Sequence, residues 1–253
     1  MYPKFDAETD KNKIVDFIRN WFDNNGNSKT KAVIGLSGGK DSTVASALCV
    51  EALGKDRVFG VLMPNGEQKD IDDAIRVAKH LGIQYAIINI NGAFNEMVKG
   101  LSAIKDLIVK ENPDVKINLA PRLRMATLYA VAQSFTEGGR VINTCNASED
   151  YVGYSTKFGD SAGDIGPLAT YTVGEVIQIG DALGLPEDLV HKTPSDGLCG
   201  KSDEDNLGFT YAVLDRYIKT GECDDPKVKE NIDRRHRLNL HKISPLPVVE
   251  RTF

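Results

Sequence analysis

The chain has 253 residues, 41% of them hydrophobic and 26% charged, which fits one large globular α/β domain or two small ones. A formal net charge of −5 argues against a nucleic acid as the main partner, because binding a polyanion needs a basic face. No apolar run approaches the ~18 residues of a membrane span and no secretory leader is recognisable, so we expect a cytoplasmic protein without membrane contacts.

The first part of the chain alternates between short β-branched runs and amphipathic helical patterns. Apolar residues three and four apart predict helices, and short continuous apolar runs predict strands that are buried on both faces. The predicted strands are 31–36, 57–63, 84–90 and 140–144. The predicted helices here are 10–24, a stretch from Ser42 to about 53, 69–81, a stretch ending at 108, and 119–135.

The pattern changes after Thr144. Two polar, glycine-bearing stretches, 146–170 and 191–205, are too long for plain connections, so we expect functional loops there. Helices are predicted at 172–183, about 205–219 and 225–240. Because strands alternate with helices and no linker interrupts the chain, we predict a single domain over residues 1–253. Its fold class is α/β: a doubly wound, Rossmann-like, five-stranded parallel sheet in the order 3-2-1-4-5, with helices on both faces.

The strongest functional signal is a glycine-bearing stretch between the first strand and the next helix, Ser37-Gly38-Gly39-Lys40-Asp41-Ser42. Adjacent glycines let the backbone approach a ligand, and a helix start offers unpaired N–H groups, so the stretch predicts a phosphate cradle. It is not a Walker A loop, since Asp41 follows Gly39-Lys40 and position 34 is Ile. A carboxylate in a phosphate cradle needs a cation, which makes Asp41 a predicted magnesium ligand. The alternative is a capped turn in which Asp41 only complements the helix dipole.

This strand-loop-helix stretch resembles that of the PP-loop ATP pyrophosphatases, which have a fold of the adenine nucleotide α-hydrolase type. Members bind ATP through this loop and cleave it between the α- and β-phosphates. The resemblance implies a set of ATP-binding residues: Gly35, Leu36, Ser37, Gly38, Gly39, Lys40, Asp41, Ser42, Thr144, Lys192 and Ser195. Lys192 and Ser195 lie in the second polar loop and are expected to close over the phosphates.

Within this superfamily, the stretches Thr144–Glu149 and Ser155–Asp160, followed by Asp164, resemble the pattern of the NAD synthetases. Further segments agree in order along nearly the whole chain: Met63–Asp73, Arg122-x-Arg124-Met125, 192–198 and His241-Lys242. One position departs from the pattern, because many members have a lysine where this chain has Val173. Lys40 or Lys201 could supply that contact with ATP instead.

The resemblance implies a reaction and a set of site residues. ATP adenylates the carboxylate of deamido-NAD (nicotinic acid adenine dinucleotide), and ammonia then displaces AMP to give NAD. Mg²⁺ is the implied cofactor, held by Asp41 and Glu149, and a homodimer is the implied assembly. Ser37 and Asp160 are the predicted catalytic residues, Asp160 by binding ammonium and easing the loss of its proton. The implied deamido-NAD contacts are Arg122, Lys157, Asp164, His241 and Lys242.

Each of these residues also has a structural explanation. Glu149 could be an exposed loop carboxylate, Thr144 a strand cap, and Arg122 a helix residue that merely reaches solvent. Lys157 with Asp160 and Asp164 could form a solvated charge cluster. The rival functions are a tRNA-thiolating enzyme of the same superfamily and a nucleotide-binding sensor without turnover.

Ammonia, not glutamine, is the expected nitrogen donor. The synthetase pattern accounts for the whole chain and leaves no residues for a glutaminase domain. Using glutamine would also require a nucleophilic cysteine, whereas Cys49 lies on an apolar helix stripe and Cys223 has acidic neighbours that disfavour a thiolate.

Overall fold

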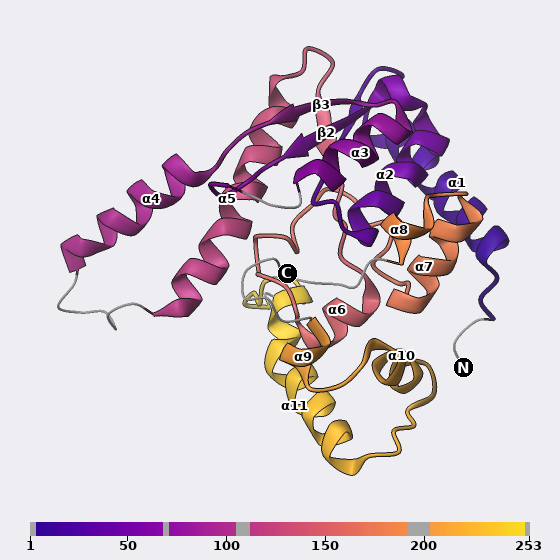
Figure 1. Cartoon of the computed structure of the whole chain (residues 1–253), viewed down its shortest axis with the longest axis vertical. Helices are drawn as coiled ribbons and strands as arrows, with labels where there is room; N and C mark the ends of the chain where they lie inside the picture. Colours follow the sequence, from indigo (N-terminus) through magenta and orange to yellow (C-terminus); the bar gives the residue numbers. More distant parts are fainter. Residues whose placement is uncertain (1–3, 68–70, 105–111, 192–202, 251–253) are drawn as a thin grey trace.

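The computed structural model describes residues 4–67, 71–104, 112–191 and 203–250 (Figure 1). Four strands in these residues, β1 (Lys31–Gly35), β2 (Val58–Leu62), β3 (Gln84–Ile87) and β4 (Gly139–Val141), form a parallel sheet in the order β3-β2-β1-β4. The predicted class and the order of the first four strands are confirmed.

The fifth strand is reduced to one contact in the described residues. Ile142 pairs with Ile165 as an isolated parallel bridge beyond β4, at the edge where a fifth strand was expected. The pairing ends at once because Gly166 and Pro167 follow, and proline has no N–H to donate to a ladder. The expected fifth strand is therefore wrong as a regular strand, although its place in the sheet is kept.

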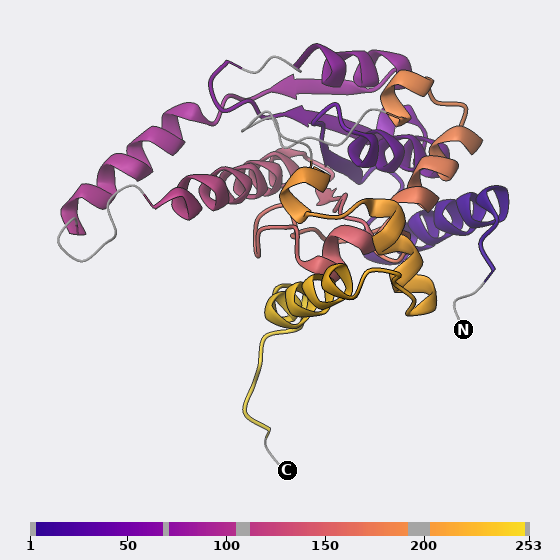
Figure 2. The ribbon, with the colours of Figure 1, turned by 60° about the horizontal axis from the view of Figure 1, so that its bottom comes forward.

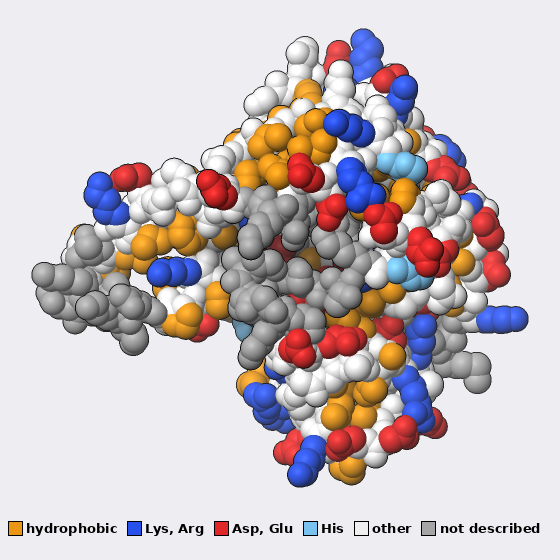
Figure 3. All heavy atoms as spheres, in the orientation of Figure 1, with side chains coloured by type: hydrophobic (Ala, Val, Ile, Leu, Met, Phe, Trp, Pro, Cys, Tyr) orange, Lys and Arg blue, Asp and Glu red, His pale blue; other side chains and the backbone are white. Residues whose placement is uncertain are grey.

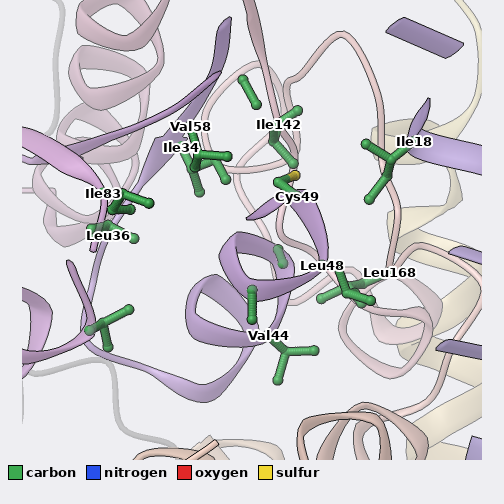
Figure 4. Packing of buried hydrophobic residues seen from close by; sticks show 14 of the residues in the cluster. Ile18, Ile34, Leu36, Val44, Leu48, Cys49, Val58, Ile83, Ile142 and Leu168 are labelled. Carbon is green, nitrogen blue, oxygen red and sulfur yellow. The ribbon is translucent and has the colours of Figure 1, made fainter. Parts of the chain in front are cut away.

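Helices cover both faces of the sheet, as predicted. One face packs against α1 (Ala7–Asn25), α2 (Lys40–Leu53), α3 (Ile71–Leu81), α7 (Val173–Ala182) and α8 (Glu187–Val190). The other face packs against α4 (Asn91–Gly100) and α5 (Pro113–Ser134). Neighbouring β1 residues point to opposite faces: Ile34 joins the first core and Val33 the second. Figure 4 shows members of the first core, with Ile34 beside Val58, and Cys49 of α2 beside Ile142.

The second half of the chain builds a separate helical layer. It contains α6 (Ala147–Val152), α9 (Asp203–Leu207), α10 (Tyr211–Thr220) and α11 (Pro226–Ile243), which share a third core. These helices group together away from the sheet, and α11 runs alongside α6 (Figures 1 and 2). Short 3₁₀ turns at Lys55–Arg57 and Leu101–Ile104 complete the described elements.

Three local predictions need correction. The single helix expected at 205–219 is two, α9 and α10, because Gly208 (φ +82°) ends the first and the Thr210 side chain caps the second. The expected loop 146–170 contains α6. Helix α5 begins at Pro113, six residues before the expected 119, because the Asn112 side chain caps it and proline suits a first turn.

No helix in the described residues is both long and apolar enough to cross a membrane.

Candidate active site

The phosphate-type loop lies between β1 and α2, at the carboxyl edge of the sheet, where ligands of doubly wound sheets bind. Gly38 has φ +79°, and a Cβ there would lie 2.9 Å from the backbone nitrogen of Ala74 in α3. The turn therefore requires glycine. Gly39 is the N-cap of α2, and its carbonyl accepts bonds from the Ser42 and Thr43 hydroxyls and the Thr43 N–H.

Hydroxyl groups brace this loop from inside. Ser37 Oγ accepts a bond from the Gly39 N–H at 3.2 Å and shares a hydrogen bond with Ser42 Oγ at 3.1 Å. Ser37 is exposed, so its oxygen can also face a ligand. Gly35 is half-buried at the end of β1, whereas the Leu36 side chain is buried against Gly60. Leu36 can therefore meet a ligand only through its backbone.

Asp41 and Glu149 face each other across a buried asparagine. The Asn146 side chain donates to Asp41 Oδ1 at 3.0 Å, while its own oxygen caps α6 by accepting the Ser148 and Glu149 N–H groups. Burial raises the pKa of Glu149 well above its usual value, and the negative charge of Asp41 raises it further. Glu149 is thus not an exposed loop carboxylate: it is half-buried on α6, near enough to Asp41 for the two charges to interact.

Lys40 supplies a buried positive charge beside these carboxylates. Its Nζ lies 2.9 Å from Asp41 Oδ2, and its side chain is 3% exposed. Burial lowers the pKa of Lys40, but the charges of Asp41 and Glu149 outweigh it and raise this pKa above the usual value. The ammonium therefore stays charged. Val173, by contrast, is buried and offers only its N–H, which donates to Ser148 Oγ. Lys201 lies outside the described residues.

A second group of predicted residues surrounds the segment 153–160. Lys242, on α11, donates to the carbonyls of Gly153 and Ser155 at 2.7 and 2.9 Å. Lys157 donates to the His241 carbonyl at 2.6 Å, and Arg122 of α5 donates to the Lys157 carbonyl at 3.3 Å. Residues far apart in the sequence thus meet at one place: Arg122, Lys157, His241 and Lys242.

Asp160 lies between the two groups. Its Oδ1 accepts the Thr156 N–H at 2.9 Å. The carboxylate is exposed, yet partial desolvation raises its pKa while the Thr156 bond opposes that shift. Its charge acts on Glu149 of one group and Lys242 of the other. No ion pair joins Asp160 to Lys157 in the described residues, so the expected structural alternative of such a pair is not seen.

The remaining predicted residues divide three ways. Asp164 stands apart: it accepts the Val141 N–H at 2.7 Å and the Tyr129 hydroxyl at 3.3 Å, so it anchors a segment beside β4. Thr144 is half-buried just beyond β4, at the carboxyl edge. Lys192 and Ser195 lie outside the described residues. Lys157, Asp160 and Asp164, all in the described residues, each bind backbone groups, and no ion pair joins them.

The sequence reasoning assigned no role to three residues of the site. Asn146 joins the carboxylates, and its capping-box spacing to Glu149 could have revealed it. Asp215 of α10 accepts the Ser148 hydroxyl and the Gly174 N–H, which ties α6 to α7. Arg124 donates to the Met63 carbonyl at the end of β2, and burial lowers its pKa. Only folding brings the last two to the site.

Acidic and basic side chains are interspersed over the described part of the face in Figure 3. Beside the loop itself, Lys40 supplies a positive charge, because its ammonium is buried next to Asp41.

The fold and the site together define a doubly wound α/β protein whose strand-to-helix loop faces a pair of carboxylates. The chain belongs to the NAD synthase family, whose model matches residues 11–247. It is 40% identical over 207 residues to an NH(3)-dependent NAD(+) synthetase of Pyrococcus furiosus, covering 81% of this chain and 75% of that protein. It is 36% identical over 243 residues to one of Alkaliphilus metalliredigens, covering 93% and 96%.

A solved structure is also similar over the whole length. The NMN synthetase from Francisella tularensis superposes with a TM-score of 0.86 at 33% identity, covering 99% of this chain and 100% of that one.

Proposed function

We propose that this protein is an AMP-forming ligase that uses ATP to amidate deamido-NAD with ammonia, giving NAD, AMP and pyrophosphate. The observation that carries this proposal is the pair Asp41 and Glu149, joined by Asn146 at a phosphate-type loop. Two like charges held together beside a helix start suit a site that takes a cation with a polyphosphate. The family match supplies the substrate class.

The carboxylates fit magnesium. The described residues contain no group of three or more His, Cys, Asp or Glu side chains that could hold a metal by themselves, so a cation here would rely on this pair together with its ligand's oxygens. Mg²⁺ is usually held in this way, by one or two carboxylates, with phosphates and water completing its shell. When bound between Asp41 and Glu149, it would neutralise charge on the phosphates.

The residues of the chain divide the remaining work. The α2 N-terminus and Lys40 stabilise the negative charge that develops on the leaving pyrophosphate. Arg122, Lys157 and Lys242 hold the anionic dinucleotide so that a carboxylate oxygen attacks the α-phosphorus as the bond to the β-phosphate bridge breaks. Ammonia then forms the C–N bond and AMP leaves. Asp160, whose pKa is raised, accepts a proton from ammonium before this attack.

Free ammonia remains the proposed donor. Burial raises the pKa of Cys49 to about 12, and burial followed by the Glu149 charge raises that of Cys145 well above its usual value. Neither thiol is therefore activated as a nucleophile for releasing ammonia from glutamine. Cys199 lies outside the described residues.

We also propose a cytoplasmic homodimer. Supporting the dimer, α11 and the segment after it expose apolar side chains, which a second copy would cover: Leu238, Leu240, Ile243, Leu246, Val248 and Val249. The free thiols of Cys49, Cys145 and Cys223 accord with a reducing compartment. Light scattering during gel filtration tests the dimer, and cell fractionation tests the compartment.

One assay tests the proposed function. The protein is incubated with ATP, Mg²⁺, deamido-NAD and ammonium, and NAD, AMP and pyrophosphate are measured. AMP release that requires the acid substrate supports the ligase. ATP binding without any AMP release would instead support the sensor alternative, and sulfur transfer to tRNA the thiolating alternative.

A second candidate substrate has its own support. Because the similar Francisella structure is that of an NMN synthetase, nicotinic acid mononucleotide is the alternative acid. The chemistry at the carboxylate is the same, so only the ratio of kcat/KM for the two acids decides. A ratio in favour of the mononucleotide would replace deamido-NAD in the proposal and leave the reaction unchanged.

A further inference from the structure

Two buried side-chain oxygens in the described residues have no hydrogen-bond partner, Ser155 Oγ and the Tyr211 hydroxyl, and Tyr211 is the one that contacts Lys40. It is the first residue of α10, its side chain lies in the third core, and the residue is 4% exposed. Its N–H donates to Glu204 Oε1 at 2.8 Å, which fixes the start of the helix. Its hydroxyl, however, is buried and has no hydrogen-bond partner in the described part of the chain.

A buried donor without an acceptor is costly, and native proteins rarely keep one. The surroundings show which acceptor would suit this hydroxyl. Lys40 Nζ lies over the Tyr211 ring, 5.7 Å from its centroid. Burial and the nearby charges of Glu149, Asp203 and Asp41 raise the pKa of Tyr211, so the group keeps its proton and can donate it. The ring thus places a donor beside the proposed nucleotide site.

The site carboxylates bind other groups and do not accept the Tyr211 hydroxyl. Asp41 Oδ1 accepts Asn146 and Oδ2 accepts Lys40, while Glu149 Oε2 accepts the Asn146 N–H. An acceptor brought from outside must be compatible with Lys40 and the α2 N-terminus, both of which attract an anion. The ring itself cannot stack on a base, because its face is buried and covered by Lys40.

We propose that Tyr211 is a further nucleotide-binding residue, whose hydroxyl donates to a phosphate oxygen of ATP held by Lys40 and the α2 loop. The identity of this ligand rests on the proposed function. Because the hydroxyl is buried, the side chains around the ring must rearrange first. Lys40 lies over this ring, and its flexible stem lets the ammonium follow the phosphates away from Asp41.

The test compares Tyr211→Phe with Tyr217→Phe. Tyr217 lies on the same helix, and its hydroxyl is satisfied, donating to Asp233 and accepting from Lys229. Each change removes one hydroxyl from α10. Calorimetry with Mg-ATP, without acid or ammonium, gives Kd, and thermal unfolding gives the ligand-free melting temperature.

We expect Tyr211→Phe to raise the Kd for Mg-ATP about tenfold or more, with an equal or higher ligand-free melting temperature. Tyr217→Phe should lower the melting temperature and leave Kd unchanged. In turnover, Tyr211→Phe should raise the KM for ATP more than it lowers kcat.

A wild-type Kd in Tyr211→Phe, or a loss of melting temperature equal to that of Tyr217→Phe, would overturn the proposal. A native chain that binds Mg-ATP but makes no amide would refute the proposed function and leave this comparison valid. A native chain that does not bind Mg-ATP would refute both.

Discussion

Replacing Gly38 with alanine should destabilise the fold, since two effects add at this position. The backbone has φ +79°, where a side chain costs roughly 1–3 kcal/mol in a sparsely populated region. In addition, the new Cβ would lie 2.9 Å from the Ala74 nitrogen and 3.0 Å from Asp73 Cβ. Ordinary contact begins at 3.4 Å, so α3 would have to retreat by about 0.5 Å.

The second effect can be isolated with a matched control. Gly221, the C-cap of α10, has φ +76°, and a Cβ there meets nothing within 4 Å. Gly221→Ala therefore carries the backbone strain alone, roughly 1–3 kcal/mol. Because the atom that Gly38→Ala meets is helix backbone, which cannot rotate away, crowding should add about 1–3 kcal/mol, the usual cost of overpacking.

Equilibrium urea unfolding of both variants and the native chain measures this difference through the midpoint at constant slope. We expect Gly38→Ala to lose at least about 1 kcal/mol more of its free energy of unfolding than Gly221→Ala. Equal losses would show that α3 is not packed against the loop as described, and would remove the steric reason for glycine at position 38.

Three further predictions concern charge and chemistry. Asp41→Asn and Glu149→Gln should each lower kcat about 100-fold or more at saturating Mg²⁺, because several kcal/mol of charge stabilisation would be lost. Circular dichroism should show that both variants fold. Near-normal turnover in either variant would contradict the metal role. Burial raises the pKa of Asp150 to about 6, so the folded state binds this proton more tightly and the group's stabilisation is lost as pH rises from about 4 through 6. The full shift would correspond to roughly 3 kcal/mol, which partial exposure reduces. Asp150→Asn should then raise the free energy of unfolding by about 1 kcal/mol at pH 8 and leave it unchanged at pH 4, and equal urea midpoints at pH 8 would refute this. Steady-state kinetics of the purified chain should show NAD synthesis with ammonium and not with glutamine, and Asp160→Asn should weaken the dependence of the rate on ammonium. Equal synthesis with glutamine would overturn the donor prediction. Unchanged kinetics in Asp160→Asn would overturn only the role of Asp160.

The sequence by itself determined the sheet class, the order of its first four strands and the phosphate-type loop. The elements and the loop depend on local physics, since β-branched runs, helical periodicity, and adjacent glycines before a helix start are all visible within a few residues. The order of the strands then follows from the rules for connecting parallel strands. Asp41 could be identified for the same reason, because a carboxylate inside a phosphate cradle is conspicuous without any tertiary contact.

Tertiary structure alone decided how the site is joined. Asn146 meets Asp41 across 105 positions of the sequence, and Ser148 meets Asp215 across 67. Such contacts leave no periodic signal, since each depends on where whole helices pack. The same limit explains why Asp164 binds the backbone of β4. It also explains why Tyr211, at the start of α10, lies under the ammonium of Lys40 in α2.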